Sequence, residues 1–266
     1  MTKIIVLAAG QGTRLRPLTD KLPKALVKLG RNSILDEQLC VYRKLKLADI
    51  TVVGGYQINE FKDYNFKLIQ NKEFEESNMV YSLFCAHEYF NGKQDIIVAY
   101  GDIVFQPEVL EGLIQSNGDV VVTADREWLA LWRLRMEEPL SDAETFKINS
   151  DGNYITELGN KPKSLADIQA QYIGLVKFSK RVTKKVYEYY LSLRNQLADS
   201  AYKNMYFTDF IQLLIENDVS QVNAHFIERG WLEVDSIEDL DIYRELLTQC
   251  DYATLGFTPR QNRENI

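Results

Sequence analysis

The residues best suited to chemistry lie in a basic, glycine-rich loop near the start of the chain. The loop follows the apolar run 4–7, which predicts a buried strand; it contains Gly10, Gly12 and Arg14, and it ends at Lys24. Glycines permit a positive φ and a close approach to the backbone, so that N–H groups can surround phosphate oxygens. Arg14 and Lys24 can neutralise the charge on such oxygens. The loop therefore predicts a site for a phosphorylated ligand.

Two common phosphate-binding motifs do not describe this loop. The dinucleotide-binding motif needs a small residue three positions after Gly12, where the chain has Leu15, and the P-loop needs Gly-Lys followed by Ser or Thr, which the loop lacks. The pattern that remains is G-x-G-T-R-L-x-P-L-T-x(3)-P-K, which begins at Gly10. The simpler alternative is an ordinary glycine-containing turn between a strand and a helix.

Asp102 is a candidate metal ligand. It follows the apolar run 95–100, which predicts another buried strand, and open α/β sheets bind ligands at the carboxyl ends of parallel strands. Mg²⁺ prefers one or two carboxylates together with the phosphate oxygens of a substrate. Asp235, just before a predicted helix, is a second carboxylate of interest. An Asp at that place can also serve only to stabilise the start of the helix.

The charge of the chain limits the kind of ligand. The 266 residues carry a net charge of −7, which argues against a general binder of nucleic acid or of an anionic membrane. Residues 1–31, however, hold seven basic residues and one acidic residue, so this segment carries +6 and the remainder −13. A basic patch on an acidic protein suits a small polyanionic ligand better than a long polymer.

The composition also excludes several classes of site and favours one compartment. No apolar stretch approaches the ~18 residues of a membrane span, and the N-terminus lacks the layout of a signal peptide. Three distant cysteines without a C-x-x-C pair favour reduced thiols in a cytoplasmic protein. Two histidines are too few for a histidine-rich metal site, and no G-x-S-x-G motif supports a Ser-His-Asp triad.

Strands and helices alternate over residues 1–124, which indicates βαβ units and a mostly parallel sheet covered on both faces. The strands of this part are predicted at 4–7, 50–53, 66–69, 95–100 and 120–123, with helices beginning at Ser33, Asn78 and Pro107. The later part predicts a hairpin (145–149 and 154–158), strands at 172–178 and 222–227, helices at 180–197 and 199–217, and a final helix from Ser236. We expect one domain over 1–250 and a loosely attached tail over 251–266.

The loop pattern resembles that of the nucleotidyltransferases that activate sugar phosphates and small phospho-alcohols as nucleotide conjugates. Two further segments match this family: residues 231–236, of the form W-x-E-[IV]-D-[ST], and Lys161 followed by Pro162. The resemblance implies an α/β fold with a Rossmann-like mixed, mostly parallel sheet between helices. It also implies a nucleotide-binding half at 1–127 and an acceptor-binding elaboration at 128–230.

The resemblance assigns roles to particular residues. Arg14 and Lys24 would act on the triphosphate and at the reaction centre. Asp102 and Asp235 would hold Mg²⁺ together, and Lys161 would hold the phosphate of the acceptor. The nucleotide would also contact residues at the ends of the first strand and of the strand before Asp102, namely Leu7, Ala8, Ala9, Gly10, Gln11, Gly12, Thr13 and Gly101.

The segment 76–83 departs from the sugar nucleotidyltransferases, which usually carry a Gln-x-x-P-x-G type segment there. It resembles the branch that makes CDP conjugates of small phosphorylated amines and amino acids, such as phosphocholine, aminoethylphosphonate or phosphoglutamine. By position, Asn78 and Ser82 would hydrogen-bond cytosine. Alternatively, Asn78 only caps a helix and Ser82 lies on the surface of that helix.

Candidate residues for binding the acceptor gather in the later part of the chain. They are Trp128, Trp132, Arg133, Asp142, Glu144, Lys161 and Tyr172. Trp128 and Trp132, one helical turn apart, can form half of an aromatic cage for a quaternary ammonium group, or a stripe of the core. Asp142 and Glu144 can bind an ammonium group, and Arg133 can bind a carboxylate or phosphate. An amine acceptor would use the two acids, and an amino acid would use all three.

These expectations describe a transfer reaction with CTP and a small phosphorylated acceptor as partners and Mg²⁺ as cofactor. The acceptor's phosphate oxygen would attack the α-phosphorus of CTP and release pyrophosphate. A phosphate monoester is mostly dianionic near neutrality, with a second pKa of about 6, so no general base is required. The alternatives are a sugar-1-phosphate nucleotidyltransferase using UTP, dTTP or GTP, and a non-catalytic nucleotide-sensing subunit. A glycosyltransferase is disfavoured because residues 101–104 contain no D-x-D.

Overall fold

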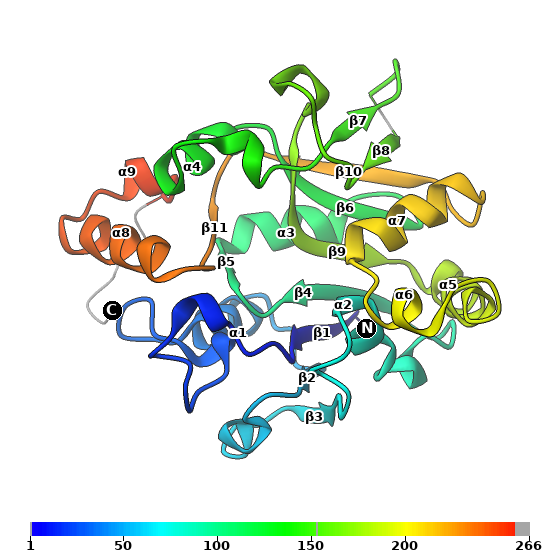
Figure 1. Cartoon of the computed structure of the whole chain (residues 1–266), viewed down its shortest axis with the longest axis horizontal. Coiled ribbons are helices and arrows are strands. Elements are labelled where there is room, and N and C mark those ends of the chain that lie inside the picture. Colours follow the sequence, from blue (N-terminus) through cyan, green and yellow to red (C-terminus); the bar gives the residue numbers. More distant parts are fainter. Residues whose placement is uncertain (1, 153, 259–266) are drawn as a thin grey trace.

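The computed structural model describes residues 2–152 and 154–258, and its centre is a seven-stranded sheet (Figure 1). From one edge to the other, the strands are β10 (Val222–Ile227), β6 (Val120–Asp125), β9 (Gln171–Phe178), β4 (Asp95–Tyr100), β1 (Thr2–Ala8), β2 (Ile50–Gly54) and β3 (Lys67–Gln70). β9 is antiparallel to β4 and β6, whereas the other neighbouring pairs in this sheet are parallel. The predicted mixed, mostly parallel sheet is confirmed.

Apolar side chains alternate between the two faces of the sheet, as expected for strands buried on both sides. Ile4 and Val6 of β1 belong to the apolar cluster that contains α1 (Ile34–Lys44), α3 (Pro107–Gln115), α4 (Trp128–Arg135) and α8 (Ile237–Thr248). Ile5 and Leu7 belong to the cluster that contains α2 (Met79–Phe84), α5 (Lys180–Leu193), α6 (Asp199–Lys203) and α7 (Phe207–Glu216). The sheet therefore lies between two helical layers, as Figure 1 shows.

Three predicted helix starts are confirmed, and a capping side chain lies at each of them. The Ser33 hydroxyl accepts from the N–H of Asp36 at 3.1 Å, and the Asp36 carboxylate accepts from the N–H of Ser33 at 3.2 Å, which makes a capping box for α1. Ser236 and Asp239 form the same box at α8, and the Asn78 side chain accepts a backbone N–H at the start of α2. In the part of the chain that the structure covers, no helix has the length and apolar content to cross a bilayer.

The single helix predicted over 199–217 is wrong. The chain forms α6 and α7 instead, separated by residues 204–206. Tyr206 has an extended backbone, and its N–H donates to the carboxylate of Asp209 at 3.3 Å, which starts a second helix in a new direction. The apolar residues of α6 and α7 are spaced as they would be in one continuous helix, so the sequence pattern does not reveal this break.

Two short antiparallel pairs accompany the main sheet. β7 (Phe146–Ile148) and β8 (Ile155–Leu158) form the predicted hairpin. β5 (Ile103–Phe105) pairs with β11 (Trp231–Glu233), although the two strands are far apart in the sequence. This second pair was not predicted, because strands of three residues are too short for an apolar pattern to identify them.

The end of the described chain packs against the rest of the protein. α9 (Tyr252–Leu255) follows α8, its Leu255 is buried, and the Arg229 side chain donates to the carbonyl oxygen of Thr254. The prediction of a loosely attached tail is therefore wrong for residues 251–258. The remainder of that predicted tail, 259–266, lies outside the described residues.

Candidate active site

The glycine-rich loop and the end of β4 meet at one pocket on the carboxyl edge of the sheet. The N–H of Gly101 donates to the carbonyl oxygen of Leu7 at 2.8 Å, and a Cβ on Gly101 would lie 2.7 Å from that oxygen, so this position requires glycine. Predicted nucleotide-binding residues that line the pocket are Leu7, Ala8, Ala9, Gly10, Lys24, Asn78, Ser82, Gly101 and Asp102. The lining also includes Ala25, Phe74, Ser77, Met79 and Tyr100, which were not predicted as site residues. Its lining does not include Gln11, Gly12, Thr13 or Arg14.

The two glycines of the loop have different environments. Gly12 has a φ of +69°, and a Cβ on it would lie 2.8 Å from the Cβ of Lys24, so the Lys24 side chain packs directly over it. The Thr19 hydroxyl donates to the carbonyl oxygen of Gly12 at 2.7 Å and holds the loop in place. Gly10 lacks a positive φ and has no atom within 4 Å of the place a Cβ would occupy. Gly12 therefore makes room for Lys24, whereas Gly10 leaves room for a ligand.

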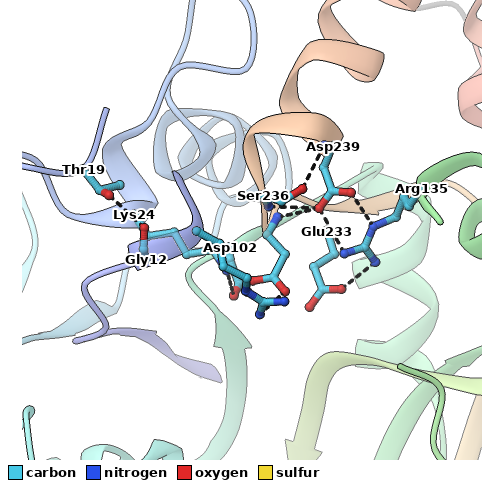
Figure 2. A network of polar contacts seen from close by, with 10 residues as sticks. Gly12, Thr19, Lys24, Asp102, Arg135, Glu233, Ser236 and Asp239 are labelled. Carbon is cyan, nitrogen blue, oxygen red and sulfur yellow. Dashed lines mark hydrogen bonds and ion pairs between the residues drawn. The ribbon is translucent and has the colours of Figure 1, made fainter. Parts of the chain in front are cut away.

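Lys24 lies between two carboxylates from distant parts of the chain (Figure 2). Its Nζ is 2.8 Å from Oδ2 of Asp102 and 2.5 Å from Oδ1 of Asp235, and Arg14 forms an ion pair with Asp235 as well. Burial alone would lower the pKa of Lys24, but the negative charges of Asp102 and Asp235 raise it above its ordinary value. Burial alone would raise the pKa of Asp235, yet Lys24 and Arg14 hold it lower. The structure thus brings together all four predicted residues in one network of ion pairs.

The pairing of β5 with β11 explains why the two aspartates meet. Asp102 directly precedes β5, and Asp235 lies just after β11. The N–H of Val234 donates to the carbonyl oxygen of Asp102 at 2.9 Å, which extends the ladder beyond the paired strands. The backbone itself therefore fixes the separation of the two carboxylates.

Arg135 supports the Asp235 side of this site through a second ion-pair network (Figure 2). Its guanidinium lies 2.7 Å from Glu233 and donates twice to Asp239, at 3.0 and 3.1 Å. The same Asp239 carboxylate accepts the backbone N–H groups of Asp235 at 2.9 Å and Ser236 at 3.1 Å. Arg135 is 2% exposed, so the network is part of the core. Arg135 was not predicted as a site residue; the only signal in the sequence was Asp239, the acid that completes the Ser236 capping box.

The proposed aromatic cage of Trp128 and Trp132 is wrong. Both side chains are buried, at 4% and 3% exposure, and their rings pack edge to face with centroids 5.7 Å apart. Trp132 also packs against Trp231, with centroids 6.1 Å apart. These tryptophans fill the space between α4 and β11, because large apolar rings at a helix face that meets a strand are most stable when buried.

The structure does not bring three of the charged acceptor candidates to the pocket. Arg133, Asp142 and Lys161 are exposed, and none of them lines it. Arg133 is exposed because the face of α4 that carries Arg135 packs against the core. The roles assigned to these three residues stay predictions.

Glu144 and Tyr172 lie closer to the pocket. The Tyr172 ring packs edge to face against Tyr100, which lines the pocket, with centroids 5.6 Å apart. Tyr172 is 8% exposed, and its hydroxyl has no hydrogen-bond partner among the described residues. A carboxylate oxygen of Glu144 accepts from the Thr208 hydroxyl at 3.3 Å. Burial raises the pKa of Glu144 to about 7, although Thr208 opposes the shift.

Comparison with known proteins assigns this arrangement to a family. The sequence profile described as a MobA-like NTP transferase domain matches residues 4–155, more than half of the chain. The chain belongs to this family of nucleotidyltransferases.

Individual relatives of this nucleotidyltransferase include cytidylyltransferases. The CTP:phosphoglutamine cytidylyltransferase of Campylobacter jejuni is 37% identical over 252 residues, which are 91% of this chain and 98% of that protein. The choline-phosphate cytidylyltransferase of Streptococcus pneumoniae is 36% identical over 90 residues, which are 32% of this chain and 39% of that protein. The solved structure of CTP:phosphocholine cytidylyltransferase from Streptococcus pneumoniae matches with a TM-score of 0.70 at 20% identity, over 92% of this chain and 99% of that one. This last match shows the shared fold.

Asp102 offers a carboxylate oxygen to a divalent cation, whereas both oxygens of Asp235 form ion pairs with Lys24 and Arg14. Oδ1 of Asp102 is buried and has no hydrogen-bond partner among the described residues, so it remains available as a ligand. Within 2–152 and 154–258, no group of three or more His, Cys, Asp or Glu side chains is arranged to hold a metal. A cation at Asp102 and Asp235 would therefore complete its shell with phosphate oxygens of the nucleotide, which is the arrangement that Mg²⁺ prefers.

Gly12→Ala is expected to reduce both stability and nucleotidyl transfer. The free energy of unfolding should fall by about 1–2 kcal/mol, because alanine is strained in the left-handed region. The new methyl group would also displace Lys24, so kcat should fall roughly 10- to 100-fold. Denaturant unfolding and steady-state kinetics measure the two effects, and Gly10→Ala is the control for stability. A normal kcat in Gly12→Ala would contradict the positioning of Lys24 by this glycine.

The pH dependence of stability should reveal the state of Glu144. Its pKa in the folded protein is about 7, against an ordinary value of 4.5, so the folded protein retains a proton that the unfolded chain releases in this range. Stability contributed by Glu144 is therefore lost as the pH rises from about 4.5 to about 7. Glu144→Gln cannot ionise, so its Tm should rise relative to wild type over this window and then level off.

The control for this measurement is Glu157→Gln in the β7–β8 hairpin. A hydrogen bond from Lys147 holds the pKa of Glu157 below its ordinary value of 4.5, so the sign is opposite. The Tm of Glu157→Gln should therefore fall relative to wild type as the pH rises toward 4.5. A flat Tm difference for Glu144→Gln across the whole range would contradict the raised pKa of Glu144.

Proposed function

We propose that this nucleotidyltransferase transfers CMP from CTP to the phosphate of a small phosphorylated amine or amino acid and releases pyrophosphate. The observation that carries the proposal is that Lys24 and Asp102 line the same pocket as Asn78 and Ser82. The first two have the charges that triphosphate chemistry needs, and the other two present polar groups where a base can bind. The similarity to a CTP:phosphoglutamine cytidylyltransferase over 98% of that protein supports CTP as the nucleotide.

In this proposal the protein's own residues position the reactants and offset negative charge. Arg14 and Lys24 lie at the triphosphate, and Lys24 keeps its proton because its pKa is raised, so it serves as a fixed positive charge. An oxygen of the acceptor's phosphate bonds to the α-phosphorus, and the bond from that phosphorus to the pyrophosphate oxygen breaks. No proton has to be removed, because the attacking monoester has a second pKa of about 6. Mg²⁺ at Asp102 and Asp235 supplies further charge neutralisation when bound.

The acceptor's cationic group is proposed to bind beside Glu144, Tyr100 and Tyr172. Tyr100 lines the pocket and Tyr172 packs against it. Glu144 would ionise when the cationic group binds, because a nearby positive charge lowers the pKa of a carboxyl group. Lys161 is proposed to hold the acceptor's phosphate, on the basis of the motif alone. Asp142 and Arg133 are exposed and are proposed only as groups at the entrance.

The proposal places the enzyme in a reducing compartment, the cytoplasm. Cys40, Cys85 and Cys250 are all free thiols, and Cys250 is exposed. Exposed thiols persist in reducing surroundings. CTP and the phosphorylated acceptor are the proposed partners.

A matrix of pyrophosphate-release assays tests the proposal. CTP, UTP, dTTP and GTP are each combined with phosphocholine, phosphoglutamine, aminoethylphosphonate and glucose-1-phosphate in the presence of Mg²⁺. The proposal expects turnover with CTP and one of the first three acceptors, and loss of turnover when EDTA replaces Mg²⁺. Turnover with glucose-1-phosphate and UTP or dTTP, and none with CTP, would identify a sugar-phosphate enzyme instead. Absence of turnover with saturable nucleotide binding would identify a sensing subunit.

A further inference from the structure

Asn71 is a buried polar residue just after β3 that does not line the pocket. Its side chain is 0% exposed, and its Nδ2 lies 2.9 Å from the hydroxyl oxygen of Ser77 and 3.0 Å from that of Ser82. Both serines line the nucleotide pocket. Asn71 therefore touches the pocket wall from behind and acts on the site only through these hydroxyl groups.

The orientation of the Asn71 amide is fixed by the backbone. The N–H of Glu73 donates to Oδ1 of Asn71 at 2.9 Å, and only the oxygen end of an amide can accept this hydrogen. The NH₂ group must then face the two serines, and it has one hydrogen for each. The geometry makes Asn71 the donor and both serine oxygens the acceptors.

The two serine hydroxyl groups differ in the acceptor to which each donates its own hydrogen. The Ser77 hydroxyl donates to the carbonyl oxygen of Glu73 at 2.6 Å. The Ser82 hydroxyl accepts from Asn71, and in the described part of the chain it donates to no other group. Since its oxygen faces Asn71 as an acceptor, its hydrogen remains available to the pocket that Ser82 lines.

We infer that Asn71 is a positioning residue that sets nucleotide specificity by making the Ser82 hydroxyl a hydrogen-bond donor toward the base. The inference rests on the proposed use of CTP. Cytosine has an acceptor at N3, whereas uracil has an N–H there, so a hydroxyl whose hydrogen is kept free for the base favours cytosine. A hydroxyl that was free to turn could serve either base, because it can donate or accept.

Asn71→Asp reverses this polarity with almost no change in size. The Asp carboxylate can still accept from the N–H of Glu73, but it has no hydrogen to give, so the Ser82 hydroxyl turns to donate to it. Ser82 then presents an acceptor to the base. We expect kcat/KM for CTP to fall roughly 10- to 100-fold, and the ratio of kcat/KM for CTP over UTP to fall by a similar factor. Affinities for CTP and UTP, measured by calorimetry without acceptor, should change in the same way.

The chain offers a matched control and two companion variants. Asn91 makes the same turn, in which its Oδ1 accepts the N–H of Lys93 at 3.0 Å. It lies before the amino end of β4, whereas the pocket lies at the carboxyl ends of the strands. Asn91→Asp should leave the nucleotide ratio unchanged. Asn71→Ala, which adds no buried charge, frees the Ser82 hydroxyl to turn and should also lower the ratio. In a Ser82→Ala background, Asn71→Asp should change the ratio no further.

The nucleotide ratio separates this role from a purely structural one. Loss of folded protein lowers the rates with CTP and UTP equally, so it leaves the ratio unaltered. A wild-type ratio retained in both Asn71→Asp and Asn71→Ala would overturn the inference while leaving the proposed function intact. A wild-type enzyme that prefers UTP would contradict the proposed function itself, and with it the assignment of Ser82 to cytosine.

Discussion

Lys24→Ala is expected to lower kcat for pyrophosphate release by about 10²- to 10³-fold while the protein stays folded. The Lys24 side chain is 13% exposed, and its Nζ lies 2.8 Å from Asp102 and 2.5 Å from Asp235, so alanine removes the positive charge between the two carboxylates. Arg14 contacts Asp235 from a side chain that is 65% exposed, and it should retain that contact in the variant. Because a fixed charge acts most strongly on the transition state, the loss should appear in kcat more than in KM.

Lys28→Ala is the matched control for this experiment. Lys28 lies in the same basic segment, but its side chain is exposed and does not line the pocket. Its substitution should change kcat less than about twofold, since an isolated surface charge contributes little. Thermal unfolding of both variants checks that they are folded. Near-normal pyrophosphate release by Lys24→Ala would remove this residue from the reaction centre.

Arg135→Met is expected to have the largest effect on stability. Its removal leaves Glu233 and Asp239 without their cation in the core, and breaking a buried ion pair from one side costs about 3–5 kcal/mol. For a chain of this size the Tm should fall by about 10 °C. Methionine keeps most of the volume, so the effect reports the charge rather than a cavity. Thermal and denaturant unfolding measure it.

Arg133→Met provides the comparison, because it changes the same residue type two positions earlier on the same helix. Arg133 is exposed, so its substitution should alter the free energy of unfolding by less than about 0.5 kcal/mol. In Arg135→Met, the carboxylate of Asp239 also loses the partner that orients it toward the N–H of Asp235. The apparent affinity for Mg²⁺ in the folded fraction should therefore weaken. Equal stabilities of the two variants would show that the Arg135 network is dispensable.

Local signals in the sequence predicted most of the main sheet. The apolar runs that became β4 and β6 are bounded by glycine or aspartate, and β1 ends two residues before Gly10, so these boundaries are visible in a single sequence. The capping boxes at Ser33 and Ser236 depend on residues three positions apart, so the helix starts at these two residues were predicted too. The break at Tyr206 was not, because it depends on the direction in which α7 packs.

At the site, too, local sequence signals predicted some residues, whereas residues that depend on long-range contacts were not predicted. Lys24, Asp102 and Asp235 belong to recognisable segments, and the structure brings them together. The burial of Trp132 depends on Trp231, which arrives through the β5–β11 pairing that no local pattern indicates. Arg135 and Arg133 are chemically equivalent in the sequence, and only the rotation of α4 decides which of them is buried. Asn71 resembles any polar residue after a strand until its partners are known.

The antiparallel direction of β9 has a consequence for how this enzyme can change its substrate. The parallel strands reach the pocket with their last residues, whereas β9 reaches it with its first: Gln171 and Tyr172 pair with Asp125 and Ala124 at the carboxyl end of β6. The segment 126–170 therefore leaves the sheet at the end of β6 and returns to it at the start of β9, and both points lie at the pocket edge. Its hairpin of β7 and β8 pairs with neither β1 nor β4, so a change in that hairpin need not shift the register of those strands. In the proposed function, acceptor choice would therefore lie in this segment, apart from the strands that border the pocket.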